Sequence, residues 1–187
     1  MPRGAVNPQS REQIISELHA VREESAAYWQ SLPTDRFLSS IGEAWSPAEN
    51  VRHLTKSMRA LTVGLRLPRW VLALRFGSAK TPSRSFDTLH DTYHTRLALG
   101  ASAGRFAPSA RRASANTEAQ RREIMAQHTQ ALGAFCDAAA PWPEAALDRR
   151  VLPHPLLGRL TVREMLLFTL IHNRHHLTQV QSKLAAR

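Results

Sequence analysis

The sequence predicts an all-α protein, a four-helix bundle with one long crossover between its second and third helices. Three observations support this. Four segments carry apolar residues at helical spacing. No segment alternates apolar and polar residues as a half-buried strand would. About 50 residues separate the second and third segments, far more than an ordinary bundle loop. A chain of 187 residues is most simply a single domain, 1–187, large enough to bury a core without disulfides or a structural metal.

Apolar periodicity alone predicts the first and third helices. Residues 9–32 place an apolar stripe opposite Glu and Arg side chains, and the stripe ends at Pro33. Residues 116–139 carry Leu132 and Phe135 on their apolar side and end before the stretch "PWP". The stripe of the first helix consists of Ile14, Ile15, Leu18, Val21, Ser25, Tyr28 and Leu32.

The second and fourth helices are predicted by their starting signals. Each begins with a capping box, in which a hydroxyl side chain and a Glu three residues later satisfy free backbone N–H groups. The second helix, 46–66, also has a proline at its first helical position, and the fourth runs over 161–184. The capping pairs are Ser46 with Glu49 and Thr161 with Glu164.

The crossover, 67–115, is expected to contain structure of its own. The stretches "PRWVLALRF" and "SFDTLHDTYHTRLAL" can form short helices, while "GASAGRFAPSARRASA" is typical of a mobile or wrapping loop. Residues 66–115 hold nine basic and two acidic side chains, which is +7 of the net charge of +10. Arginines such as Arg111 and Arg112 could attract an acidic substrate, although a solvated loop in an arginine-rich chain explains the charge equally well.

Several classes of protein are disfavoured by composition. The charge forms no basic stripe along a helix, and no aromatic residues interleave with the arginines, so nucleic-acid binding is not expected. No apolar run approaches the roughly 20 residues of a membrane span, and the first residues lack a secretory signal. The single cysteine, Cys136, excludes an internal disulfide and is expected to be a small buried residue. These features together favour a cytoplasmic location.

Three histidines lie close together near the end of the chain, in "LIHNRHHLTQV". Residues four apart share a helix face, so His172 and His176 can bind one ion. His175 diverges from His176 by about 100° and is expected at an edge or in solvent. A histidine pair is also typical of a polar helix end. His53, beside the apolar stripe of the second helix, supplies a third imidazole, and three is the ligand number of an open, catalytic zinc-type site.

Two stretches resemble motifs of the DinB-like metalloprotein superfamily. The first is "WSPAENVRHL" in the second helix, and the second is "HPLLGRLTVREMLLFTLIHNRHHLTQV" at the end of the chain. The stretch "YHTRLALGASAGRFAPS" is similar to the family's crossover, so the resemblance covers most of residues 10–184. It implies a four-helix bundle with a long link between helices 2 and 3, and it assigns His53, His172 and His176 as the three metal ligands.

The resemblance also implies a class of activity. Family members bind divalent ions such as zinc or nickel, and several use a low-molecular-weight thiol, bacillithiol or mycothiol, in transfer or isomerisation reactions. We therefore expect a metal-dependent thiol S-transferase or related detoxification enzyme that acts on an electrophile. The alternative is a non-catalytic metal-binding stress-response protein that acts through self-association, since homodimers are common in the family, or through a protein partner.

Other polar residues receive more ordinary interpretations. His90 and His94 also have helical spacing, but no third partner is evident and a surface location is expected. His154 is expected to help seat the loop before the fourth helix. Glu49 could accept the free ring N–H of His53, although its capping role already explains it. Gln179, three residues beyond His176, could face the same cavity as the metal, or it could be the polar end of the helix stripe.

Overall fold

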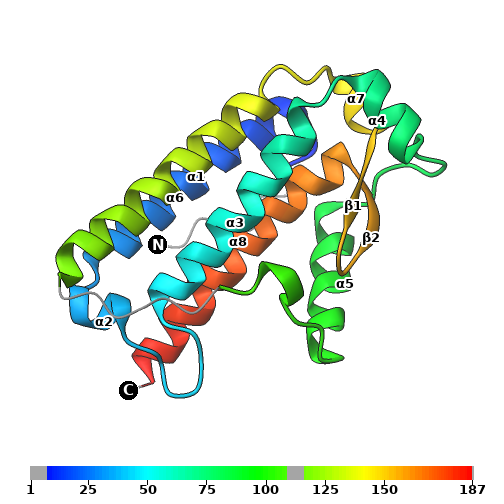
Figure 1. Ribbon diagram of the computed structural model, residues 1–187. Coiled ribbons are helices and arrows are strands. Elements are labelled where there is room, and N and C mark those ends of the chain that lie inside the picture. Colours follow the sequence, from blue (N-terminus) through cyan, green and yellow to red (C-terminus); the bar gives the residue numbers. More distant parts are fainter. Residues whose placement is uncertain (1–7, 109–115, 187) are drawn as a thin grey trace.

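Four long helices pack lengthwise in the computed structural model, which describes residues 8–108 and 116–186 (Figure 1). The four-helix prediction is confirmed, and the predicted helix ends agree with the observed ones to within two residues. The long helices are α1 (Arg11–Ser31), α3 (Pro47–Arg66), α6 (Thr117–Ala139) and α8 (Val162–Ala185).

The second and third long helices run parallel to each other, as the long crossover permits (Figure 1). Thr55, in the middle of α3, lies beside His128 in the middle of α6. Near the carboxyl end of α3, the carbonyl of Leu65 accepts a hydrogen bond from the indole N–H of Trp142, which follows α6, at 3.2 Å. The crossover must therefore return the chain to the starting end of the bundle.

Capping boxes begin α3 and α8 as the sequence predicts, and a further one begins α1. The box of α8 has an added function. One oxygen of Glu164 accepts from the Thr161 N–H at 2.8 Å, while the other accepts from the backbone N–H and the guanidinium of Arg84, at 2.9 and 2.7 Å. The start of α8 thus fixes the segment that leads into the crossover helix α5 (Phe86–Ala98).

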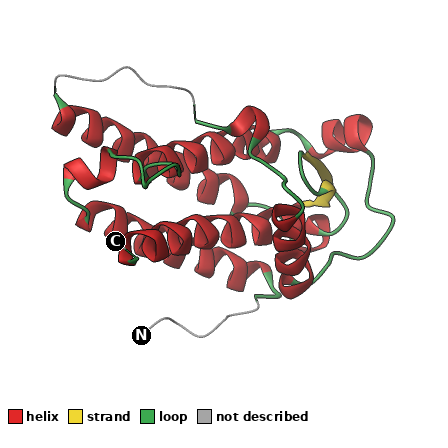
Figure 2. Cartoon of the chain, turned by 90° about the horizontal axis from the view of Figure 1, so that it is seen from below, coloured by secondary structure: helices red, strands yellow, loops and turns green. Residues whose placement is uncertain are grey.

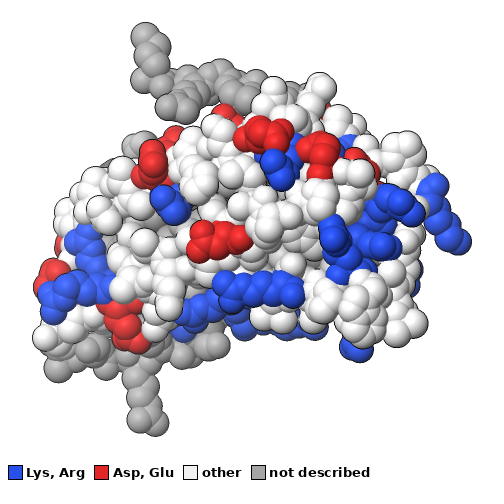
Figure 3. Space-filling view, turned by 90° about the horizontal axis from the view of Figure 1, so that it is seen from above, with Lys and Arg blue, Asp and Glu red and all other residues white. Residues whose placement is uncertain are grey.

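The crossover contains α4 (Arg69–Phe76), α5 and a short 3₁₀ helix, η1 (Gly104–Phe106), so both predicted short helices are confirmed. Viewed from above, Lys and Arg side chains cluster at the α4 end of the molecule and also run along the lower edge of the view, whereas Asp and Glu side chains are scattered over the long helices (Figure 3). Arg111 and Arg112 lie outside the described residues.

A two-stranded antiparallel hairpin lies before α8 and was not predicted (Figure 2). Its strands are β1 (Val151–His154) and β2 (Gly158–Thr161), and Val151 pairs with Thr161. The turn uses Gly158 at φ 74°, a backbone conformation that favours glycine. Strands of four residues are too short to show alternation, and Pro153 in β1 further weakens the strand signal, which is why the sequence did not reveal the hairpin. The short helices α2 (Thr34–Leu38) and α7 (Glu144–Leu147) were also missed.

The buried core surrounds α8, whose first two turns are covered on nearly every side. In α1 the predicted stripe is correct except near its end, where the fully buried aromatic is Trp29 while Tyr28 is partly buried. Cys136 is buried, as expected. Within residues 8–108 and 116–186, we find no helix whose length and apolar character would allow it to cross a membrane.

A fully buried histidine joins the two parallel helices. The hydroxyl of Thr55 donates to the Val51 carbonyl at 2.7 Å, so His128 Nδ1–H must donate to the Thr55 oxygen at 3.0 Å. The other ring nitrogen of His128 has no hydrogen-bond partner. Burial lowers the pKa of His128 from 6.5 to about 4.

This histidine should make folding sensitive to acid. Because the folded pKa lies below the unfolded one, its contribution is present above pH 6.5 and is lost as pH falls toward 4. Full loss amounts to about 3 kcal/mol, at ~1.4 kcal/mol per pKa unit. Urea unfolding of metal-free protein at neutral and at acidic pH should show a smaller pH dependence for His128→Gln than for wild type. The exposed His19 provides the control, His19→Gln, and an unchanged dependence in His128→Gln would contradict this role.

Candidate metal site

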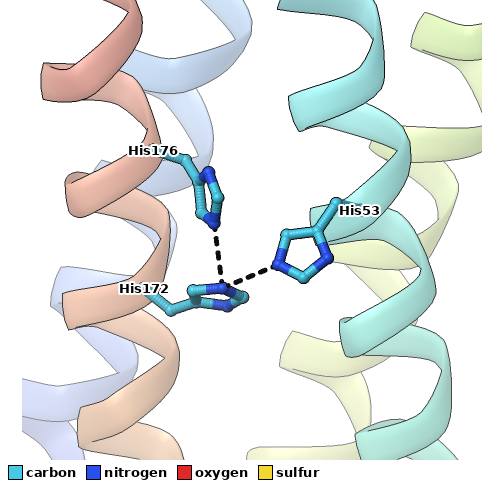
Figure 4. Close-up of side chains that lie close together, drawn as sticks. All are labelled: His53, His172 and His176. Carbon is cyan, nitrogen blue, oxygen red and sulfur yellow. Dashed lines mark hydrogen bonds between the residues drawn. The ribbon is translucent and has the colours of Figure 1, made fainter. Parts of the chain in front are cut away.

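His53 on α3 faces His172 and His176 on α8, and the three rings point toward a common centre (Figure 4). The Nε2 atom of His172 lies 3.0 Å from that of His53 and 3.1 Å from that of His176. One ring nitrogen from each residue lies within 4.8 Å of the other two, and all three side chains are buried. The structure thus brings together the three residues that the sequence singled out.

Hydrogen bonds at the outer edges of two rings fix their tautomers. His53 Nδ1–H donates to the carbonyl oxygen of Phe106 in η1 at 2.8 Å, and His176 Nδ1–H donates to Asn50 Oδ1 at 2.7 Å. The Asn50 amide cannot turn over freely, because its Nδ2 donates to the Ser46 carbonyl at 2.9 Å. Both rings therefore direct an Nε2 lone pair toward the centre.

Three buried nitrogens then compete for too few protons. The lone pairs of His53 and His176 both face the Nε2 of His172, which carries at most one hydrogen and can satisfy only one of them. The Nε2 lone pair of His53 or of His176 is therefore left facing a nitrogen that has no hydrogen to offer it, in the protein interior. A cation at the centre removes this conflict, so the donor set fits a divalent metal ion.

The electrostatic environment keeps these rings neutral. Burial lowers the pKa of His172 and of His176 well below 6.5, and neighbouring imidazoles lower both further. Burial also lowers the pKa of His53, against the opposing effect of its hydrogen bond to Phe106. Neutral imidazole is the form that binds metal.

The three histidines lie in the wall of a cavity of about 630 Å³. Aromatic rings support them. Phe168 stacks on His172 with ring centroids 5.2 Å apart, and the ring centroids of Trp45 and His53 are 5.3 Å apart. Much of the remaining wall is apolar and comes from α3, the crossover and the hairpin, including Met58, Leu61, Leu67, Phe76, Leu97 and Leu152. Three described side chains with a formal charge line the cavity: Glu43, Arg105 and Lys183.

Comparison with known proteins identifies the family. The profile of the DinB superfamily matches residues 6–180. The chain belongs to the DinB superfamily. Two solved structures share its fold, at 18% and 14% identity. One is TT2238, a four-helix bundle protein (TM-score 0.56, covering 92% of this chain and 99% of that one). The other is YfiT from Bacillus subtilis, described as a probable metal-dependent hydrolase with an unusual four-helix bundle topology (TM-score 0.61, covering 98% of this chain and 90% of that one). A search of curated proteins finds no match.

The remaining helix α8 predictions are largely correct. His175 does not join the buried group, as expected, but it is half-buried in the cavity wall and does not project into solvent. Burial and the nearby His94 and His90 lower the pKa of His175 to about 4. Gln179 lines the same cavity as the histidine triad.

The prediction about an outer partner of His53 needs correction. Glu49 does not accept from His53, because its carboxylate accepts from the Ser46 N–H at 2.8 Å within the capping box. The partners are instead Phe106 and Asn50, which the sequence analysis missed. Asn50 did leave a signal, since asparagine is unfavourable inside a helix and this one stands three residues before His53. A backbone carbonyl such as that of Phe106 leaves none.

The crossover histidines lie at the surface, as expected. His90 and His94 are exposed and belong to α5, the second of the predicted short helices. A third partner does exist, because the ring of His175 lies 5.3 Å from that of His94. His154 has the predicted structural role: its Nδ1 accepts from the backbone N–H groups of Leu156 and Leu157, at 3.3 and 3.1 Å, within the hairpin turn.

The Asn50 contact should tune metal affinity. Asn50→Leu removes the acceptor that orients His176, and loss of such an outer partner typically weakens metal binding about 10- to 100-fold. Asn50→Asp keeps an acceptor and should retain the affinity. Competition titration of zinc against a chromophoric chelator measures both.

Asn173→Leu is the matched control, because Asn173 is also a buried asparagine of the cavity wall but donates to the Thr169 carbonyl. Wild-type affinity in Asn50→Leu, or an equal loss in Asn173→Leu, would contradict the role of Asn50.

Proposed function

We propose that this protein is a metal-dependent enzyme that transfers a low-molecular-weight thiol to an apolar electrophile, using a divalent ion held by His53, His172 and His176. The observation that carries the proposal is the convergence of three neutral imidazoles in the wall of a large cavity. A buried ligand set that opens onto such a space leaves room for a small molecule beside the ion.

The ion would lower the pKa of a thiol bound to it. The resulting thiolate would be a nucleophile at neutral pH. The protein's own groups hold the ligands in place. Asn50 and the Phe106 carbonyl keep His176 and His53 in the tautomers that direct Nε2 inward. Phe168 and Trp45 pack against the triad and support the rings of His172 and His53.

The cavity wall supports an apolar electrophile and an acidic thiol. Apolar side chains from α3, the crossover and the hairpin form much of the surface on which an apolar substrate would rest. Arg105 and Lys183 stand at the same cavity and could pair with the carboxylate groups of a thiol cosubstrate. Lys56 keeps the Arg105 segment against α3, because its ammonium group donates to the Arg105 carbonyl at 2.5 Å.

Two alternatives fit the site less well. A non-catalytic metal protein would be expected to close its site with a fourth protein ligand. Among the described residues, no fourth His, Cys, Asp or Glu side chain joins the buried triad, which lies beside a cavity. Hydrolysis, suggested for YfiT, would benefit from a carboxylate base, yet the only described acidic residue in the cavity wall is the exposed Glu43. Three imidazoles suit zinc or nickel equally.

The activity can be tested with a chromogenic aryl chloride. Protein loaded with zinc or nickel should speed the reaction of bacillithiol or mycothiol with the aryl chloride. In this reaction the sulfur forms a bond to carbon and chloride leaves with the electron pair, while the thiol proton passes to solvent. The rate above background should disappear in His172→Ala and after chelation, and should persist in His19→Ala, which alters an exposed histidine of α1.

The same samples distinguish the competing functions. Absence of turnover with every thiol tried, across several metals, would count against the transferase. Thiol-independent cleavage of an ester or amide by the loaded protein would instead indicate a hydrolase.

A further inference from the structure

A second group of histidines lies where the crossover helix α5 packs against α8. His90 and His94 are one turn apart on α5, and α5 packs against α8 where His175 is located. The ring of His94 lies 4.3 Å from that of His90 and 5.3 Å from that of His175, measured between centroids. Residues from two separate parts of the sequence therefore meet here.

The spacing of these rings resembles that of the buried triad. There, the ring centroids of His53, His172 and His176 are 4.7 to 4.9 Å apart. The centroid distances of the outer group, 4.3 Å from His90 to His94 and 5.3 Å from His94 to His175, fall on either side of that range. Among the described residues, the ring nitrogens of the buried triad already converge. In the outer group, binding of an ion would require the exposed rings of His90 and His94 to rotate toward His175.

The outer rings also have nitrogens available. His90 Nδ1–H donates to the carboxylate of Asp91 at 3.1 Å, a contact that leaves Nε2 as the nitrogen available to an ion. The His90 side chain is 47% exposed and can turn toward a bound ion. His175 is half-buried and anchors the group to the bundle, with its ring 5.3 Å from that of His176.

We propose that His90, His94 and His175 form a second binding site for a divalent transition metal, exposed to solvent and adjacent to the buried triad. Three imidazoles would bind the ion, and water would complete its coordination. His94 is the central ligand, since its ring contacts both of the others. This site does not depend on the proposed function, because none of its ligands belongs to the triad.

The test is metal stoichiometry measured without an affinity tag. Isothermal titration and equilibrium dialysis with nickel or zinc should give two ions per wild-type chain, one of them bound more weakly. His94→Ala should weaken the second ion at least about tenfold and spare the first, since losing a ligand costs no less than losing an outer partner. His172→Ala should remove the tight ion and retain the weaker one. His19→Ala, an exposed histidine on α1, should bind both.

A spectroscopic readout locates the weaker ion. In the His172→Ala variant, added zinc should shift the imidazole NMR signals of His90, His94 and His175 and leave that of His19 in place. A single ion in the wild type, or a second ion unaffected by His94→Ala, would overturn the outer site while leaving the triad intact. Loss of the only ion in His94→Ala, with His172→Ala unaffected, would instead refute the triad.

Discussion

The architecture of the site depends on one constraint: three buried imidazole nitrogens share too few protons. Asn50 and the Phe106 carbonyl each hold a proton on the outer nitrogen of a ring, so that two inner lone pairs face the same atom of His172. Burial lowers the pKa of all three rings and opposes relief by protonation. A cation resolves the conflict, and the surrounding elements can be understood as the means of placing these nitrogens around it.

The parallel arrangement of α3 and α6 has a direct consequence for the site. A chain that must return along the bundle between them needs a long crossover, and this crossover supplies part of the surroundings of the histidine triad. Its 3₁₀ helix provides the carbonyl that orients His53, while α5 packs against α8 and brings His94 beside His175. Glu164, through Arg84, fixes the segment before α5 to the start of the helix that carries His172 and His176.

Much of this arrangement could be predicted from the sequence, for identifiable reasons. The long helices were predictable because capping boxes and apolar stripes are local signals, and the spacing of His172 and His176 is fixed by helix geometry. The partners of these histidines were less accessible. A backbone carbonyl in the crossover has no side-chain signature, the hairpin strands are only four residues long, and the meeting of His94 with His175 depends on how α5 packs.

The central claim is that His53, His172 and His176 hold a divalent ion, and elemental analysis tests it most directly. The protein should be purified without added metal or an affinity tag, then desalted to remove weakly bound ions, in parallel with His172→Ala. We predict close to one transition-metal ion per wild-type chain and only a small fraction of that in the variant. Metal retained by His172→Ala at full stoichiometry would contradict the assignment.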